Sequence, residues 1–187
     1  MRCRLLLAVL VLSSVCFAQS NRKKLFPLPS SLSELPAVAT LAPELRAAIA
    51  PAIAASSCKL NGSEKYGVAE VDLQHGTRVT LVRVDETCFC GPSGNCPILA
   101  VEGNKLVLAD SNGFAYAISS NPKGGTADLL IASHTSANVT SLQRFRWKGS
   151  HFKLQDCEAA VRKDLAMGTK WDPEELDIST CDAIALK

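Results

Sequence analysis

The alternation of apolar and polar residues between Gly67 and Cys157 constrains the fold of this chain more than any other feature. A period of two is typical of strands that bury one face, and turn-forming residues recur about every ten residues along this stretch. Tight hairpins are expected at Gly103-Asn104 and at Asn112-Gly113, the second as a type I′ turn. The strands should therefore follow one another as an antiparallel meander. The pattern predicts strands at Gly67–Asp72, Thr77–Asp85, Ile98–Glu102, Lys105–Asp110, Phe114–Ser119, Asp128–Ser133, Ser141–Trp147 and His151–Asp156.

Different patterns flank this stretch. Residues 41–57 are rich in alanine and carry leucine and isoleucine four residues apart, which predicts a helix that Pro51 should kink or split. Residues 19–40 hold prolines among serines and predict an extended linker. Residues 158–187 form a tail that is expected to begin as a short helix. The predicted fold class is α+β: an antiparallel β-meander, as a curled sheet or half-barrel, with one N-terminal helix, in a single domain over 41–187.

Residues 1–18 have the organisation of a secretory signal peptide. Arg2 and Arg4 form a positive region, Leu5–Leu12 is an apolar run too short to span a bilayer, and Cys16-Phe17-Ala18 offers small residues for cleavage after Ala18. The alternative is acylation of Cys16, but the residues before it lack the leucine and the glycine or alanine that such a site prefers. No later apolar stretch is long enough for a membrane span. We therefore expect a secreted or periplasmic protein.

Removal of this leader leaves the charge balanced. The chain holds 20 Lys and Arg against 18 Asp and Glu, and the leader contains two of the arginines and no acid. A neutral chain lacks the electrostatic footprint of a protein that binds nucleic acid or an anionic membrane. We therefore expect no nucleic-acid partner.

Cysteine usage agrees with export. Once the leader is removed, an even number of cysteines remains, and in an oxidising compartment this predicts three disulfides. The preferred pairing is Cys90–Cys96 around a turn-rich loop, Cys58–Cys88, and Cys157–Cys181 for the tail. A metal site is the alternative, because Cys88, Cys90 and Cys96 lie close in sequence. Structural zinc sites normally carry a second pair of cysteines or histidines, which is missing, so neither a metal nor a cofactor is predicted.

Four motifs follow one another between residues 90 and 152: Cys90–Pro97, Ala127–Leu130, Ser133–Ser136 and Arg144–Phe152. Their order resembles a diffuse group of uncharacterised exported bacterial proteins. These share a Cys…Gly-Asn-Cys loop, an Asp-Leu strand and a late aromatic-x-x-Gly-x-x-aromatic hairpin. The resemblance covers about residues 88–157 and implies an exported protein, without an assigned activity.

The best catalytic candidates are His134, Asp110 and Asp128. A Ser/His/Asp hydrolase needs a histidine beside an acid, and His134 follows the strand that begins at Asp128. No Gly-x-Ser-x-Gly motif accompanies them, and fully paired cysteines leave no thiolate to act as a nucleophile. A small secreted hydrolase is the alternative function.

Binding is the favoured function, and one candidate surface is the strand that ends at Trp147. Phe145 and Trp147 should project from one face of this strand, and Arg144 and Arg146 from the other. Aromatic rings with basic neighbours suit a sugar ring or an acidic peptide. The competing interpretation places the aromatic side chains in the core and the arginines in solvent.

The loop between Cys90 and Cys96 is the second candidate surface, with Ser93 and Asn95 as its binding residues. A disulfide across this loop would preorganise it, which also suits an inhibitor that inserts a loop into a wall-degrading enzyme. We therefore predict a non-catalytic module of the envelope or extracellular space that binds a protein or a polysaccharide. Asn61 and Asn138 begin glycosylation sequons, which matter only in a eukaryotic secretory route.

Overall fold

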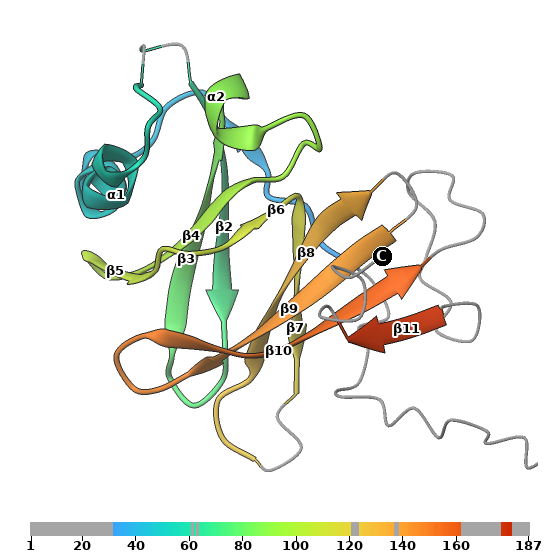
Figure 1. Cartoon of the computed structure of the whole chain (residues 1–187). Coiled ribbons are helices and arrows are strands. Elements are labelled where there is room, and N and C mark those ends of the chain that lie inside the picture. Colours follow the sequence, from blue (N-terminus) through green and yellow to red (C-terminus); the bar gives the residue numbers. More distant parts are fainter. Residues whose placement is uncertain are drawn as a thin grey trace, which may run out of the picture.

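The computed structural model describes residues 32–161, except 61, 63, 121–123 and 137–138, together with residues 177–180. These residues form two antiparallel sheets, with a helix outside the first sheet (Figure 1). Four parts of the chain lie outside the described residues: the expected leader, most of the expected linker, the sequon residues Asn61 and Asn138, and most of the tail. The predicted fold class is confirmed. The expected curled sheet is in fact two sheets that do not close into a barrel.

The first sheet follows the order of the chain. Neighbouring strands are antiparallel, and Glu102 pairs with Lys105 across a turn in which Gly103 has a φ of 60°, so the hairpin expected there is present. The strands are β1 (Ala37–Val38), β2 (Lys65–Asp72), β3 (Arg78–Asp85), β4 (Cys96–Glu102) and β5 (Lys105–Leu108), and β6 (Asn112–Gly113) also pairs with β4.

The second sheet is again a meander. Each strand pairs antiparallel with the next, and β8 pairs with β7 on one side and with β9 on the other. The strands are β7 (Ala115–Ser119), β8 (Asp128–Ser136), β9 (Val139–Trp147), β10 (Phe152–Val161) and β11 (Asp177–Thr180).

The main core lies between the two sheets. Inward side chains of the first sheet, such as Leu81 and Ile98, pack in one cluster with Leu129, Ile131 and others of the second sheet. Because alternate residues of a strand face opposite sides, the remaining apolar residues of the first sheet lie on its outer face. There they pack against the helix α1 (Pro43–Ala55). The structure therefore has a helix layer and two sheet layers.

Helix α1 spans Pro51 and is not split there. Two other expectations about these elements are wrong. The expected linker ends early, because Leu35 is buried in the main core and β1 pairs with β2. Residues 158–161 extend β10 instead of starting a helix, since they pair with both β9 and β11. Pairing with neighbouring strands here overrides the helical preference of an Ala-rich segment.

The Asn112-Gly113 pair is not a type I′ turn, and Gly113 does not have a positive φ. The pair forms β6, where the chain passes from the first sheet to the second. A Cβ atom on Gly113 would lie 2.4 Å from the carbonyl oxygen of Ala132. Glycine is therefore required for the close approach of two backbones and not for a left-handed conformation.

Two of the predicted disulfides are present, Cys58–Cys88 and Cys90–Cys96. Cys157 is also disulfide-bonded. Its predicted partner, Cys181, lies outside the described residues, although Glu158 and Thr180, the neighbours of these two cysteines in sequence, pair across β10 and β11. Among the described residues, no helix has the length and apolar character needed to cross a membrane.

Candidate functional site

The loop between Cys90 and Cys96 projects into solvent. It leaves the short helix α2 (Thr87–Cys90) and enters β4 at Cys96, and a disulfide joins its two ends. The four residues of its tip, Gly91–Gly94, are all exposed. Gly91 and Gly94 have φ values of 62° and 73°, which glycine adopts without steric cost. The loop is thus a narrow covalent ring with a solvent-facing tip.

Asn95 fixes the base of this loop to β8. Its Nδ2 donates to the carbonyl oxygen of His134 at 2.6 Å, and its Oδ1 accepts from the His134 backbone N–H at 2.7 Å. Pairing between β7 and β8 ends at Ala132, so β8 extends past its neighbour. The Asn95 amide therefore occupies the position of a missing strand and satisfies the backbone of His134. Nδ2 also approaches Ser93 Oγ at 2.9 Å.

The His134 ring packs against an aromatic neighbour. It stacks on Phe114 with a centroid separation of 4.0 Å and an interplanar angle of 6°. Burial lowers the pKa of His134, because the charged imidazolium is poorly solvated there. Burial therefore favours the neutral ring beside the anchored end of the loop.

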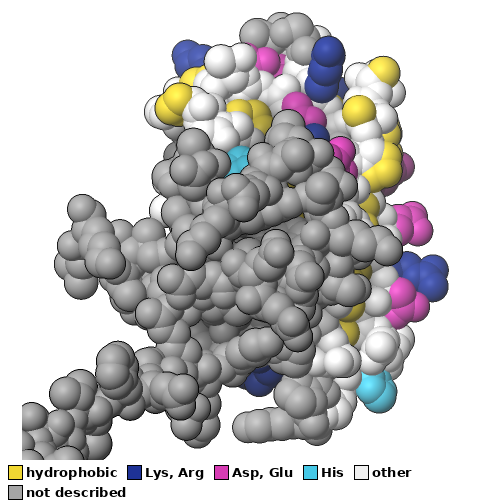
Figure 2. All heavy atoms as spheres, turned by 90° about the vertical axis from the view of Figure 1, so that its right-hand side faces the viewer, with side chains coloured by type: hydrophobic (Ala, Val, Ile, Leu, Met, Phe, Trp, Pro, Cys, Tyr) yellow, Lys and Arg dark blue, Asp and Glu magenta, His cyan; other side chains and the backbone are white. Residues whose placement is uncertain are grey.

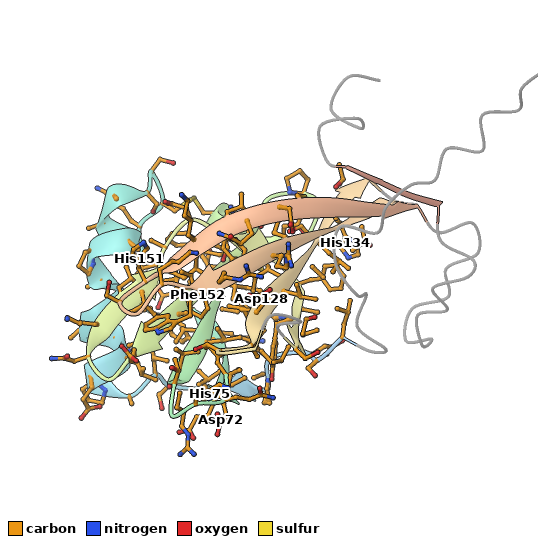
Figure 3. All side chains as sticks on the ribbon, turned by 90° about the horizontal axis from the view of Figure 1, so that it is seen from below. Asp72, His75, Asp128, His134, His151 and Phe152 are labelled. Carbon is orange, nitrogen blue, oxygen red and sulfur yellow. A yellow bond between two sulfur atoms is a disulfide. The ribbon has the colours of Figure 1, made fainter. Side chains whose placement is uncertain are left out.

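The structure does not bring the three catalytic candidates together. Asp128 and His134 lie on the same strand (Figure 3). They are six positions apart, which corresponds to about 20 Å along a β-strand. Asp110 is exposed and lines a cavity of about 280 Å³ beside Phe89 and Asn112. His134 does not line that cavity. Asp128 and His134 thus do not form the His/Asp pair that a hydrolase needs.

The two arginines of the candidate surface on β9 are bound within the protein. Arg146 forms a bidentate pair with Asp128, with both N···O distances at 2.8 Å, and Asp128 is only 1% exposed. This hydrogen bonding raises the pKa of Arg146. Arg144 bonds to Asp156 through Nε at 2.8 Å and approaches Asp128 at 3.4 Å. The two carboxylates compensate both guanidinium charges within the sheet.

The aromatic residues of the same strand belong to the core. Phe145 is 3% exposed, and Trp147 packs against the same core cluster. Trp147 meets Phe152 edge to face at a centroid distance of 5.3 Å. Of the five predicted binding residues, Ser93 is therefore the exposed one, and Asn95 positions its loop. The other three make internal contacts.

Three side chains of the kinds that bind metal ions lie close together, but all three are engaged in other bonds. Ligand atoms of Asp85, Cys90 and Cys96 lie within 4.8 Å of one another. The two sulfur atoms are bonded to each other, and the Asp85 carboxylate accepts hydrogen bonds from Arg83 at 2.6 and 3.0 Å. The cysteines thus present no thiolate in this state.

Charged side chains of both signs are interspersed on the described part of the face in Figure 2.

Comparisons with protein-family models, with curated proteins and with solved structures find no match to this chain. The class is therefore defined by architecture: a disulfide-linked antiparallel β protein with two sheets. Its particular feature is a disulfide-closed loop whose base is anchored on the second sheet.

Proposed function

We propose that this chain is an exported, non-catalytic binding module that contacts a protein or polysaccharide partner through the loop tip Gly91–Gly94. The observation that carries the proposal is the double anchoring of the loop. The Cys90–Cys96 disulfide joins its ends, and the Asn95 amide holds its base on His134. A loop ordered before binding loses less conformational entropy when its partner arrives, which improves affinity.

The chemistry of the tip suits recognition better than catalysis. It offers one hydroxyl, on Ser93, together with backbone groups and a proline ring, and it carries no charge. Such a tip can donate and accept hydrogen bonds to a sugar or to a peptide backbone. The hydrolase alternative receives no comparable support, because Asp128 lies six positions from His134 on the same strand and is bound to Arg146.

An inhibitor of a wall-degrading enzyme is a specific form of the same proposal. A narrow, exposed and covalently closed loop fits insertion into an enzyme cleft, and the anchored base would keep its shape during insertion. Export is supported by the disulfides, which persist in oxidising compartments, and by the leader pattern of residues 1–18. The proposed location is periplasmic or extracellular.

Substitution of the tip tests this proposal. Ser93→Arg places a bulky charge on an exposed tip residue, and Ser150→Arg makes the same change at the exposed turn between β9 and β10 as a matched control. Binding is measured by co-sedimentation with purified cell-wall polysaccharide and by calorimetry with purified wall-degrading enzymes, whose inhibition is also assayed. Both variants should retain the wild-type melting temperature.

The expected result is binding to one of these probes that Ser93→Arg weakens at least about tenfold and Ser150→Arg leaves unchanged. Equal binding by both variants would show that the loop is not the site. Failure of the wild-type chain to bind any of the probes would overturn the proposed partner classes.

A further inference from the structure

A second cavity, of about 420 Å³, lies beside helix α1. We call it the helix pocket. The helix supplies residues 46, 49, 50, 53 and 54 to its wall, and this spacing places them on one face. The other walls are the segment Ser56–Leu60 and Tyr66 at the start of β2. A cavity of this size is in the range that holds small organic ligands.

The wall segment Ser56–Leu60 is held in place. Ser56 donates from its backbone N–H and from its hydroxyl to the carbonyl oxygen of Ile53, at 3.1 and 2.7 Å. Two residues further, the Cys58–Cys88 disulfide ties the segment to α2. The pocket therefore exists before any ligand binds, and a ligand would not need to order its walls.

The interior is mainly apolar. Ile49 and Ile53 contribute from the helix, and Leu60 contributes from the wall segment Ser56–Leu60. Leu60 is 38% exposed, although a large aliphatic side chain is normally buried. An apolar ligand would cover this surface and gain the free energy of removing it from water.

The charged side chains that line the pocket are both cationic, Arg46 and Lys59. No ion pair with a described residue engages either of them. Burial raises the pKa of Tyr66, Glu64 raises it further and Arg46 lowers it, so the hydroxyl lies within electrostatic range of both groups. Glu64 in turn accepts a hydrogen bond from the backbone of Gly62. The protonated hydroxyl is therefore a hydrogen-bond donor that lines the same pocket as the Arg46 guanidinium.

We propose that the helix pocket binds a small amphipathic carboxylate, such as a medium-chain fatty acid. Its apolar chain would pack against Ile49, Ile53 and Leu60, and its carboxylate would lie between Arg46 and Tyr66. A guanidinium and a phenol hydroxyl both donate to a carboxylate, and Lys59 adds a second positive charge. This site is lined by residues outside the loop of the proposed function and does not depend on it.

Calorimetric titration of the full secreted chain tests the site. Octanoate carries both the apolar chain and the carboxylate, octanol keeps the chain alone, and acetate keeps the carboxylate alone. Saturable binding of octanoate is expected, with octanol about tenfold weaker and acetate not saturating. Absence of saturable octanoate binding, or octanol binding as tight as octanoate, would overturn the proposal.

Three variants locate the binding. Arg46→Gln should weaken octanoate about tenfold and leave octanol unchanged, because only the carboxylate loses its partner. Lys65→Gln removes a cation that does not line the pocket and is the matched control. Ala54→Phe, on the exposed side of the helix, should fill the pocket and abolish binding of both ligands. If Arg46→Gln and Lys65→Gln have equal effects, the carboxylate does not bind at Arg46.

Discussion

The anchoring of the loop by Asn95 makes a quantitative prediction. Asn95→Ala removes two hydrogen bonds that join the loop to the backbone of His134, at 2.6 and 2.7 Å. A typical hydrogen bond contributes about 1 kcal/mol net, and a partly buried group left without a partner adds a desolvation cost. The free energy of unfolding should therefore fall by about 2–3 kcal/mol. In a domain of this size, that lowers the melting temperature by about 4–12 °C.

Two further variants separate this anchoring from other losses at the loop. Asn95→Asp keeps the acceptor for the His134 N–H but turns a carboxylate oxygen toward the His134 carbonyl, so it should be at least as destabilising as Asn95→Ala. Ser93→Ala removes only the exposed contact to Asn95 and should cost less than about 0.5 kcal/mol.

Urea unfolding without reductant measures these differences, and amide hydrogen exchange at His134 reports the anchor directly. The His134 amide should be protected in the wild-type chain and should exchange faster in Asn95→Ala. A loss below about 0.5 kcal/mol together with unchanged protection would refute the anchoring role.

Three other substitutions test the sheets. Asp128→Ala leaves two partly buried arginines without their shared carboxylate. In urea titrations, the free energy of unfolding should fall by about 3–5 kcal/mol. A loss below about 1 kcal/mol would contradict a structural ion pair. Gly113→Ala places a Cβ 2.4 Å from the carbonyl oxygen of Ala132. Thermal unfolding should show a loss of at least about 1–3 kcal/mol in the free energy of unfolding. A neutral effect would mean that β6 does not approach β8 so closely. Because burial lowers the pKa of His134, the folded chain binds a proton less readily than the unfolded chain, so stability should fall as the pH drops from about 7 to about 5. In His134→Phe, the free energy of unfolding should depend less on pH over this range. Equal pH dependence in the wild-type and variant chains would contradict the role of His134.

The strands were predictable because their signals are local. Alternation and turn residues identify both sides of the hairpin at Gly103, and β3 differs from its predicted range by one residue at its start. The wrong expectations arise where a distant partner decides the conformation. Asn112-Gly113 has the composition of a turn, but its neighbour is β8, and residues 158–161 have helical composition but lie between two strands.

The candidate site was predictable only in part, for the same reason. The spacing of Cys90 and Cys96 around glycines and a proline is a local signal, and it identified the loop and its disulfide. The contact between Asn95 and His134 spans 39 residues of sequence, so no pattern near either residue reveals it. Likewise, the arginines of β9 look solvent-exposed until the neighbouring strands supply Asp128 and Asp156.

The order of strands has a consequence for how this chain reaches its structure. Among the described residues, every strand pairing except that of β4 with β6 joins strands that are consecutive in the chain. Pairs such as β4–β5 and β9–β10 can thus form as hairpins that close short loops at small entropic cost, which favours rapid folding for a β protein. Docking of two preformed halves then becomes the late event. The tight passage at Gly113, the bridge between Ser33 and Tyr116 and the hydrogen bond from the Ala127 N–H to the Leu73 carbonyl are backbone contacts that such docking must complete.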